Sequence, residues 1–363
     1  MAQRIDPWTS TEIADYKRLM EEFGIESMEK YRKRYAELVY IRRGIIFGHR
    51  DFAKISECME KSKKYAMMTG MMPSGRFHIG HKMVADEIIW FQKKKADIFI
   101  CAADIESFLM RSTPLEDARR IAVEEYLTNY IALGLDPEKV NFWFQSDYNS
   151  DYYKLCDMAA REVTFNELKA IYGELTTGKI ISSLKQAGDI LHPQLEAYGG
   201  TRPVVVPVGT DQDPHIRLTI DIASRLKEFK LIPPAATYHK LMKGLQGGKM
   251  SSSRPESIIS LSGDPKQESR KVMSAKTGGR TTIEEQRKLG GIPEDCVVYE
   301  FYVYHLMPDD SLLESTFKDC RNGRLTCGEC KKNCAELLEK FLTEHQKKRL
   351  DSRKKAEKLL KRK

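Results

Sequence analysis

The chain has 363 residues, enough for two or three domains that each bury a core. Hydrophobic residues make up 41% of it and charged residues 31%, with a formal net charge of +8, as expected of a soluble globular protein. No apolar run approaches the ~20 residues that a membrane span needs. The first residues, MAQRIDPWTS, carry no apolar signal core, so we expect a cytoplasmic protein that does not enter a membrane.

Residues 1–64 are predicted to form an N-terminal helical extension with a basic face. Thr9 and Glu12 have the spacing of a helix capping box ahead of the segment IADYKRLMEEF. The segment YIRRGIIFGHRDF, residues 40–52, then places basic residues on both sides of an apolar run. It precedes the first strongly predicted core strand.

From Tyr65 onward, predicted strands alternate with predicted helices. Helical spacing of apolar residues marks residues 81–95, and a second helix is expected to open at Thr113–Pro114 and to end at Gly134. The predicted strands are YAMMTG, DIFICAA, VNFWFQ and PVVVPVG. Such alternation predicts an α/β domain, residues 65–262, with a parallel sheet covered by helices on both faces. Ligands of such sheets bind at the carboxyl ends of the strands.

Residues 263–363 are predicted to form a C-terminal helical domain, because this part contains no strong strand pattern. It ends in a basic tail, residues 346–363, which contains ten Lys and Arg residues and only two carboxylates. The tail is interpreted either as a solvated or frayed helix end or as a contact for a polyanion, most naturally nucleic acid.

The segment PSGRFHIGH follows the first predicted strand and opens a helix. Backbone N–H groups at a helix start, freed by Gly75 and Gly80, favour an anion, and the imidazoles of His78 and His81 can donate to phosphate oxygens. A metal site at the two histidines is less favoured, because the motif lacks the adjacent carboxylate of helix-borne zinc sites.

A second phosphate-binding element is predicted in GGKMSSS, residues 247–253. Lys249 supplies a mobile positive charge between glycines and hydroxyls, which suits charge that develops on a pyrophosphate. Each motif alone is weakly specific, whereas the two in this order and at this separation are strongly indicative of nucleotide chemistry.

Together the motifs resemble the class I aminoacyl-tRNA synthetases, whose signatures read HIGH and KMSKS. Residues 78–81 match the first signature in full, and residues 249–253 match the second with Ser in place of its second Lys. Four longer segments between residues 40 and 291 are similar to eukaryotic and archaeal tryptophanyl-tRNA synthetases: YIRRGIIFGHRDF, VTFNELKAIYG, GTDQDPHIRLTIDIA and GGRTTIEEQRKLGG. The resemblance implies a Rossmann-like catalytic domain and a helical anticodon-binding domain.

The resemblance also implies a role for particular residues. The expected catalytic residues are His78, His81, Lys249, Ser251 and Ser252. The expected ATP-binding residues are Pro73, Ser74, Gly75, Gly80, Gly209, Asp211 and Met250. The expected amino-acid-binding residues are Met68, Glu106, Gln186, Asp189 and Gln212.

Recognition of the amino-acid ring departs from the family pattern. Met68 and Cys101 stand where eukaryotic tryptophan enzymes have the Tyr and Gln that contact the indole nitrogen. We therefore expect Asp189 to accept the indole N–H, as the matching carboxylate does in bacterial relatives. The alternative is that Asp189 only caps a helix or forms an ion pair.

Five of the eight cysteines occur after residue 295, which in a cytoplasmic protein points to a metal rather than to disulfides. Four of them, Cys296, Cys320, Cys327 and Cys330, are expected metal ligands with the spacing C-x23-C-x6-C-x2-C. Some tryptophanyl-tRNA synthetases carry a [4Fe–4S] cluster on nearly this spacing, so a cluster is expected, with zinc and free thiols as alternatives. Cys334 is a competing ligand.

The resemblance implies ATP- and Mg²⁺-dependent activation of L-tryptophan and its transfer to the 3′-terminal adenosine of tRNA(Trp). It further implies a homodimer, with a dimerisation insertion at about residues 105–190. A tyrosyl-tRNA synthetase, a small nucleotidyltransferase of the same superfamily and a non-catalytic RNA-binding relative are the alternatives.

Overall fold

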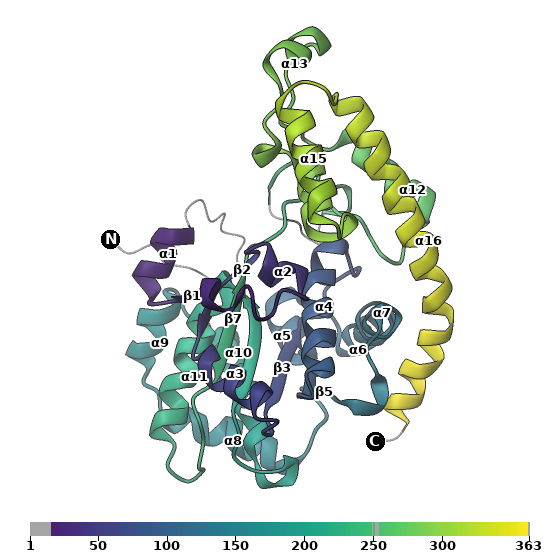
Figure 1. Cartoon of the computed structure of the whole chain (residues 1–363). Helices are drawn as coiled ribbons and strands as arrows, with labels where there is room; N and C mark the ends of the chain where they lie inside the picture. Colours follow the sequence, from purple (N-terminus) through teal and green to yellow (C-terminus); the bar gives the residue numbers. More distant parts are fainter. Residues whose placement is uncertain (1–15, 249, 251–253, 362–363) are drawn as a thin grey trace.

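The computed structural model describes residues 16–248, 250 and 254–361, which contain a seven-stranded sheet of order β1-β2-β7-β6-β3-β4-β5 (Figure 1). The strands are β1 (Glu26–Ser27), β2 (Ile46–Arg50), β3 (Ala66–Met71), β4 (Asp97–Ala102), β5 (Val140–Phe144), β6 (Val204–Gly209) and β7 (Ala235–His239). The five strands from β7 to β5 pair in parallel, so the predicted parallel sheet is confirmed.

The N-terminal segment is not purely helical, contrary to the prediction. Besides α1 (Tyr16–Phe23), α2 (Val39–Arg42) and α3 (Phe52–Glu60), it supplies β1 and β2, which extend the sheet in antiparallel pairing. An ion pair fixes this extension, because Arg50 at the end of β2 contacts the fully buried Asp213 at 2.9 Å. The predicted capping box at Thr9 and Glu12 lies outside the described residues.

Helices cover both faces of the parallel strands. They are α4 (Ile79–Lys93), α5 (Asp104–Arg111), α6 (Leu115–Ile121), α7 (Thr128–Leu133), α8 (Ser150–Arg161), α9 (Phe165–Tyr172), α10 (Thr177–Leu191) and α11 (Asp213–Arg225). Alternate residues of a strand point to opposite faces. Met67 therefore packs in the cluster that contains α4 and α7, whereas Met68 packs in the cluster that contains Ile190 of α10 and Ile216 of α11.

The predicted helix between residues 113 and 134 is present. It runs through α6, the wider turn η2 (Ala122–Leu127) and α7, and it ends at Gly134, whose φ of 120° favours glycine. Pro114, rather than Thr113, occupies the cap position.

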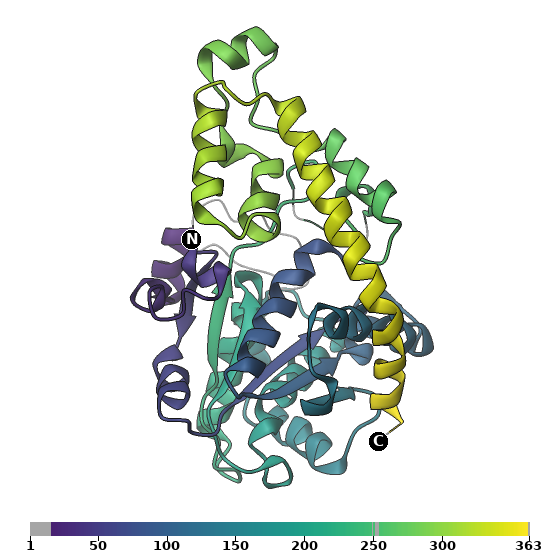
Figure 2. The same cartoon turned by 45° about the vertical axis from the view of Figure 1, so that its right-hand side comes forward.

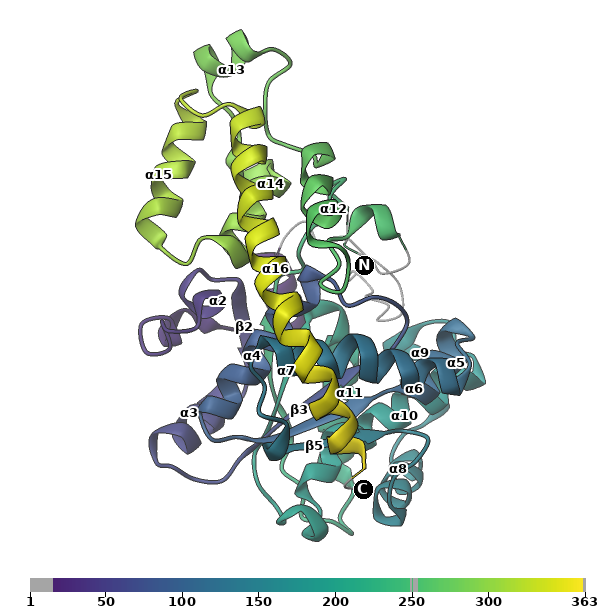
Figure 3. The same cartoon turned by 90° about the vertical axis from the view of Figure 1, so that its right-hand side faces the viewer.

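The C-terminal part is helical, as predicted. Its helices are α12 (Pro265–Arg270), α13 (Ile283–Leu289), α14 (Val297–Phe301), α15 (Asp310–Arg321) and the 34-residue α16 (Cys327–Leu360). Figure 2 shows α16 running from the C-terminal helices back to the α/β domain, and in Figure 3 it crosses beside α7.

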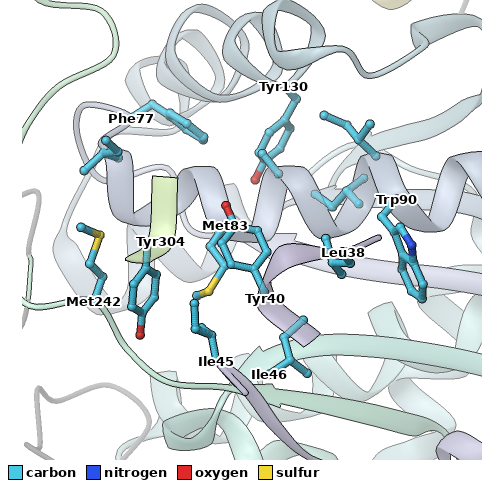
Figure 4. Packing of buried hydrophobic residues seen from close by; sticks show 14 of the residues in the cluster. Leu38, Tyr40, Ile45, Ile46, Phe77, Met83, Trp90, Tyr130, Met242 and Tyr304 are labelled. Atoms are coloured by element: carbon cyan, nitrogen blue, oxygen red, sulfur yellow. The ribbon is translucent and has the colours of Figure 1, made fainter. Parts of the chain in front are cut away.

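The core is continuous across the three parts of the chain. Figure 4 shows Tyr40 and Ile45 of the N-terminal segment beside Met83 of α4 and Tyr304 of the C-terminal part. The C-terminal helices are thus not an isolated unit but share buried apolar surface with the α/β domain.

The basic tail is a docked helix up to Leu360, so its interpretation as a frayed end is wrong. His345 Nε2 lies 2.7 Å from the Asn129 amide oxygen of α7, and Arg349 donates to the Glu124 carbonyl at 3.0 Å. Many other basic side chains of this helix stay exposed, and their contact with nucleic acid stays a prediction. None of the helices in the described part of the chain has the length and apolar character to cross a membrane.

Candidate active site

The two signature segments converge at the start of α4. The backbone N–H of Ile79 donates to the Ile259 carbonyl at 2.9 Å, and the Leu261 N–H donates to the Phe77 carbonyl at 3.0 Å. The chain that follows GGKMSSS therefore pairs like a short strand with the chain that precedes the helix. A Cβ on Gly80 would lie only 3.1 Å from Met250 Sδ, so glycine permits the close approach of the two segments.

Glu125 in η2 ties both segments together and was not predicted. Its Oε2 accepts from the Phe77 N–H at 3.1 Å and from the Ser262 hydroxyl at 2.6 Å. One carboxylate thereby fixes the entry to α4 and the exit from the lysine loop.

His78 and His81 stack on each other, with ring centroids 3.6 Å apart. The His78 N–H donates to His81 Nδ1 at 3.2 Å, so a neutral His81 carries its proton on Nε2, where it can donate to an oxyanion. Burial lowers the pKa of His81 to about 4, and burial and the neighbouring His81 hold the pKa of His78 well below its usual value. Before any anion binds, both imidazoles are therefore neutral hydrogen-bond donors at pH 7.

The remaining predicted ATP-binding residues lie on two loops at carboxyl ends of strands. Pro73, Ser74 and Gly75 form the loop between β3 and α4, which is held where the Pro73 carbonyl accepts from the Ser107 hydroxyl at 2.7 Å. Gly209 ends β6, and a Cβ there would collide with the Asp211 carboxylate. Lys249, Ser251 and Ser252 lie outside the described residues.

A cavity of about 270 Å³ opens beside these loops, at the carboxyl ends of β3 and β6. The five predicted amino-acid-binding residues all line it: Met68, Glu106, Gln186, Asp189 and Gln212. They come from β3, α5, α10 and η6 (Thr210–Gln212), so the tertiary structure brings together residues spread over 145 positions. The cavity lies at the place where parallel sheets bind ligands.

Three polar residues that line the cavity suit an ammonium group. Gln186 Nε2 donates to the Gln212 side-chain oxygen at 3.5 Å, and Gln186 Oε1 is buried without a hydrogen-bond partner among the described residues. Glu106 lines the same cavity and adds a carboxylate. A buried acceptor and a nearby carboxylate are what a charged amine requires.

Asp189 lines the same cavity, and among the described residues it neither caps a helix nor forms an ion pair. It sits in the last turn of α10, 2% exposed, and its carboxylate accepts from Tyr152 at 2.8 Å and from Gln145 at 2.6 Å. Cys101, on β4, donates more weakly to the same carboxylate at 3.4 Å. Gln145 was not predicted, although its place directly after β5 was a usable signal; nothing in the local sequence marks Tyr152.

Comparisons with known proteins show the family of the chain. The family of class I tRNA synthetases for tryptophan and tyrosine (W and Y) matches residues 60–343. The chain belongs to this family. It is 52% identical to the tryptophan–tRNA ligase of Aeropyrum pernix over 95% of this chain and 94% of that one, and 47% identical to that of Methanocaldococcus jannaschii over 98% of both.

A solved structure agrees with the computed one. The crystal structure of tryptophanyl-tRNA synthetase from Aeropyrum pernix superposes with a TM-score of 0.91 at 50% identity, covering 98% of each chain. The predicted fold class, a Rossmann-like α/β domain with helical parts, is thus confirmed.

The late cysteines gather around one small cavity of about 10 Å³, which is lined by Cys296, Cys320, Cys327 and Cys330. Cys334 lies one turn further along α16, fully buried in the core, and does not line it. The four-thiol donor set fits zinc or an iron–sulfur cluster, but this space is too small for a cluster unless the side chains move outward. Within the described residues, no group of three or more His, Cys, Asp or Glu is arranged to hold a metal ion.

Two of these thiols are protonated at neutral pH. Burial, together with smaller contributions from the neighbouring cysteines, raises the pKa of Cys320 to about 11 and that of Cys330 to about 12. Binding a metal would therefore release protons from these cysteines.

Proposed function

We propose that this synthetase is a tryptophan–tRNA ligase, which activates L-tryptophan with ATP and transfers it to the 3′-terminal adenosine of tRNA(Trp). One observation carries the proposal: the chain that follows GGKMSSS pairs with the HIGH segment at the start of α4, beside a cavity lined by Glu106, Gln186 and Asp189. Relatives named tryptophan–tRNA ligase, about half identical over nearly the whole chain, support it.

ATP would bind across the two signature segments. The His81 Nε2–H, the His78 imidazole and the N–H groups at the start of α4 offer donors to the triphosphate. Gly209 and Asp211 suit the ribose, glycine for close approach and the carboxylate for hydroxyls. Mg²⁺ would bind together with ATP, coordinated by its phosphate oxygens, and this mode of binding needs few or no protein ligands.

Tryptophan would lie in the cavity with its ammonium group at Glu106 and Gln186 and its ring toward Asp189. Its carboxylate then attacks the α-phosphorus of ATP, which forms tryptophanyl-adenylate and releases pyrophosphate. No general base is needed, because the attacking oxygen is already ionised. Catalysis consists of positioning and of stabilising the charge on the phosphates, a role in which Lys249 joins the two histidines.

In the second step a ribose hydroxyl of the terminal adenosine of tRNA(Trp) attacks the acyl carbonyl of the adenylate, which forms the ester and releases AMP and the hydroxyl proton. The C-terminal domain and the exposed basic face of α16 would contact the tRNA. A cytoplasmic location stays a prediction.

The decisive experiment is pyrophosphate exchange with ATP, measured separately with tryptophan and with tyrosine. Exchange that depends on tryptophan and not on tyrosine supports the proposal. Exchange with tyrosine alone would make the chain a tyrosyl-tRNA synthetase, and exchange with neither would favour a non-catalytic RNA-binding relative.

We further propose that the chain is a homodimer that pairs through the segment of about residues 105–190. Three large apolar side chains of this segment are strongly exposed: Phe108 (51%) on α5, Phe165 (59%) on α9 and Ile181 (44%) on α10. Exposed apolar groups gathered in one segment are typical of an interaction surface.

Phe165→Glu is expected to shift the protein from a dimer to a monomer, because it places a charge in this surface. Light scattering after size-exclusion chromatography measures the mass. Ile283→Glu, at a 65% exposed site on α13 outside the segment, is the matched control and should stay dimeric. A monomeric parent protein would contradict the proposal.

We also propose that Cys296, Cys320, Cys327 and Cys330 bind a [4Fe–4S] cluster, with zinc as the alternative. Their convergence on one cavity supports this, although they are far apart in the sequence. The group would be structural, since it lies in the C-terminal domain, away from the cavity that lies beside the signature segments.

Protein purified without oxygen is expected to contain about four iron and four sulfide per chain and to absorb near 400 nm. Cys327→Ser should lose the iron, whereas Cys334→Ser should retain it. Metal analysis that finds one zinc instead supports the alternative, and a colourless, metal-free and fully folded protein rules out both.

A further inference from the structure

A buried network of donors holds the Asp189 carboxylate. Tyr152 and Cys101 donate to Oδ1 at 2.8 and 3.4 Å, and Gln145 Nε2 donates to Oδ2 at 2.6 Å. All four side chains are at most 2% exposed. In such surroundings each hydrogen bond is strong and the loss of one is costly.

Gln145 is the member of this network that connects Asp189 to Glu106, both of which line the cavity. Its Oε1 accepts from the Glu106 N–H at 3.3 Å, so its Nε2 must face Asp189. Its backbone is also fixed, because its N–H donates to the Ala102 carbonyl at 3.2 Å and its carbonyl accepts from the Tyr153 hydroxyl at 3.1 Å. The amide therefore has one orientation.

The network leaves one acceptor position of the Asp189 carboxylate without a donor among the described residues. An ionised carboxylate has about four acceptor positions, and the protein fills two on Oδ1 and one on Oδ2. Asp189 lines the cavity, so the last position on Oδ2 is available to one donor from a ligand. An indole ring has a single N–H donor.

We propose that Gln145 is a positioning residue that determines specificity, because it aims Oδ2 of Asp189 at the ring N–H of the substrate. This inference rests on the proposed function and goes beyond it. It also explains how Met68 and Cys101 can replace the polar pair of eukaryotic relatives: Cys101 donates to Asp189 instead of contacting the ring.

Gln145 also keeps Asp189 ionised. Burial raises the pKa of Asp189 to about 6, while the donors Tyr152, Gln145 and Cys101 and the charge of Lys185 oppose the rise. Loss of one donor raises the pKa further, and a protonated Asp189 has lost an acceptor position. The other titratable groups that face Asp189 or line the cavity are Tyr148, Cys156, Glu106, Arg111, His215 and His239.

The test compares two substrates in pyrophosphate exchange: tryptophan and β-(3-benzothienyl)alanine, which has sulfur in place of the ring N–H. Gln145→Met, which keeps the size of the side chain, should lower kcat/KM for tryptophan by about 10- to 100-fold and that for the analogue by less than about threefold. As the pH falls, the ratio of kcat/KM for tryptophan to kcat/KM for the analogue should also begin to decline at a higher pH in the variant than in the parent, because Asp189 is protonated more easily in the variant. Both substrates carry the same ammonium group, so any effect of Glu106 on its binding cancels in this ratio.

The matched control is Gln194→Met. Gln194 is also buried, and both ends of its side-chain amide also form hydrogen bonds, here with the N–H and carbonyl of Ile232, but its partner does not line the cavity. It should lower thermal stability without changing the substrate ratio. Equal losses for both substrates with Gln145→Met, or no loss at all, would overturn the inference. Absence of tryptophan-dependent exchange in the parent protein would instead overturn the proposed function.

Discussion

Lys249→Ala is expected to slow the formation of tryptophanyl-adenylate by about 10²–10³ while the Kd for tryptophan changes little. In the proposed mechanism, the ammonium of Lys249 stabilises the charge that moves onto the pyrophosphate, an interaction that is stronger in the transition state than in the ground state. The neighbouring residue supports this role, because Met250 lies against Gly80 at the start of α4.

Single-turnover measurement of the adenylate separates this effect from product release, and tryptophan fluorescence gives the Kd. Lys266→Ala is the matched control, since it removes the same charge from an exposed site on α12. A parallel loss of tryptophan affinity in the Lys249 variant would mean that the loop only maintains the structure.

Asp189→Asn is expected to lower kcat/KM for tryptophan by about 10²-fold. An amide NH₂ on residue 189 would face the donors of either Gln145 or Tyr152, so one donor would lose its partner in a buried site. The substrate N–H would then compete with protein donors for the single amide oxygen.

Pyrophosphate exchange at varied tryptophan and ATP measures this loss, and the KM for ATP should stay within about threefold. Asp147→Asn is a suitable control, because Asp147 lies close to Gln145 in sequence but its side chain is 74% exposed. If the Asp189 variant keeps its full kcat/KM for tryptophan and the control is unchanged, Asp189 takes no part in recognising the ring.

The sequence could predict those features whose signal is local. Apolar runs of strand length marked β3, β4, β5 and β6, and the spacing of apolar residues marked α4. The same logic missed β7, whose residues AATYH contain no long apolar run. This strand is fully buried because it pairs with β2 on one side and β6 on the other, which no window of sequence reveals.

The active site divides in the same way. The histidines, the lysine loop and the residues of the cavity belong to short motifs, so the sequence alone determined them. Only the tertiary structure showed Glu125 and Gln145, whose partners Ser262 and Asp189 lie 137 and 44 residues away. Likewise, only the tertiary structure showed that α16 docks on α7, through a hydrogen bond between His345 and Asn129, which lie 216 residues apart.

The physical reason is that a hydrogen bond between distant residues depends on where the sheet and helices place their ends. Amide and carboxylate side chains carry no periodic signal, and their sequence neighbours do not specify a partner. Sequence therefore determined which chemical groups this protein carries, and the packing of β5, α8 and α10 decided which donors surround the Asp189 carboxylate.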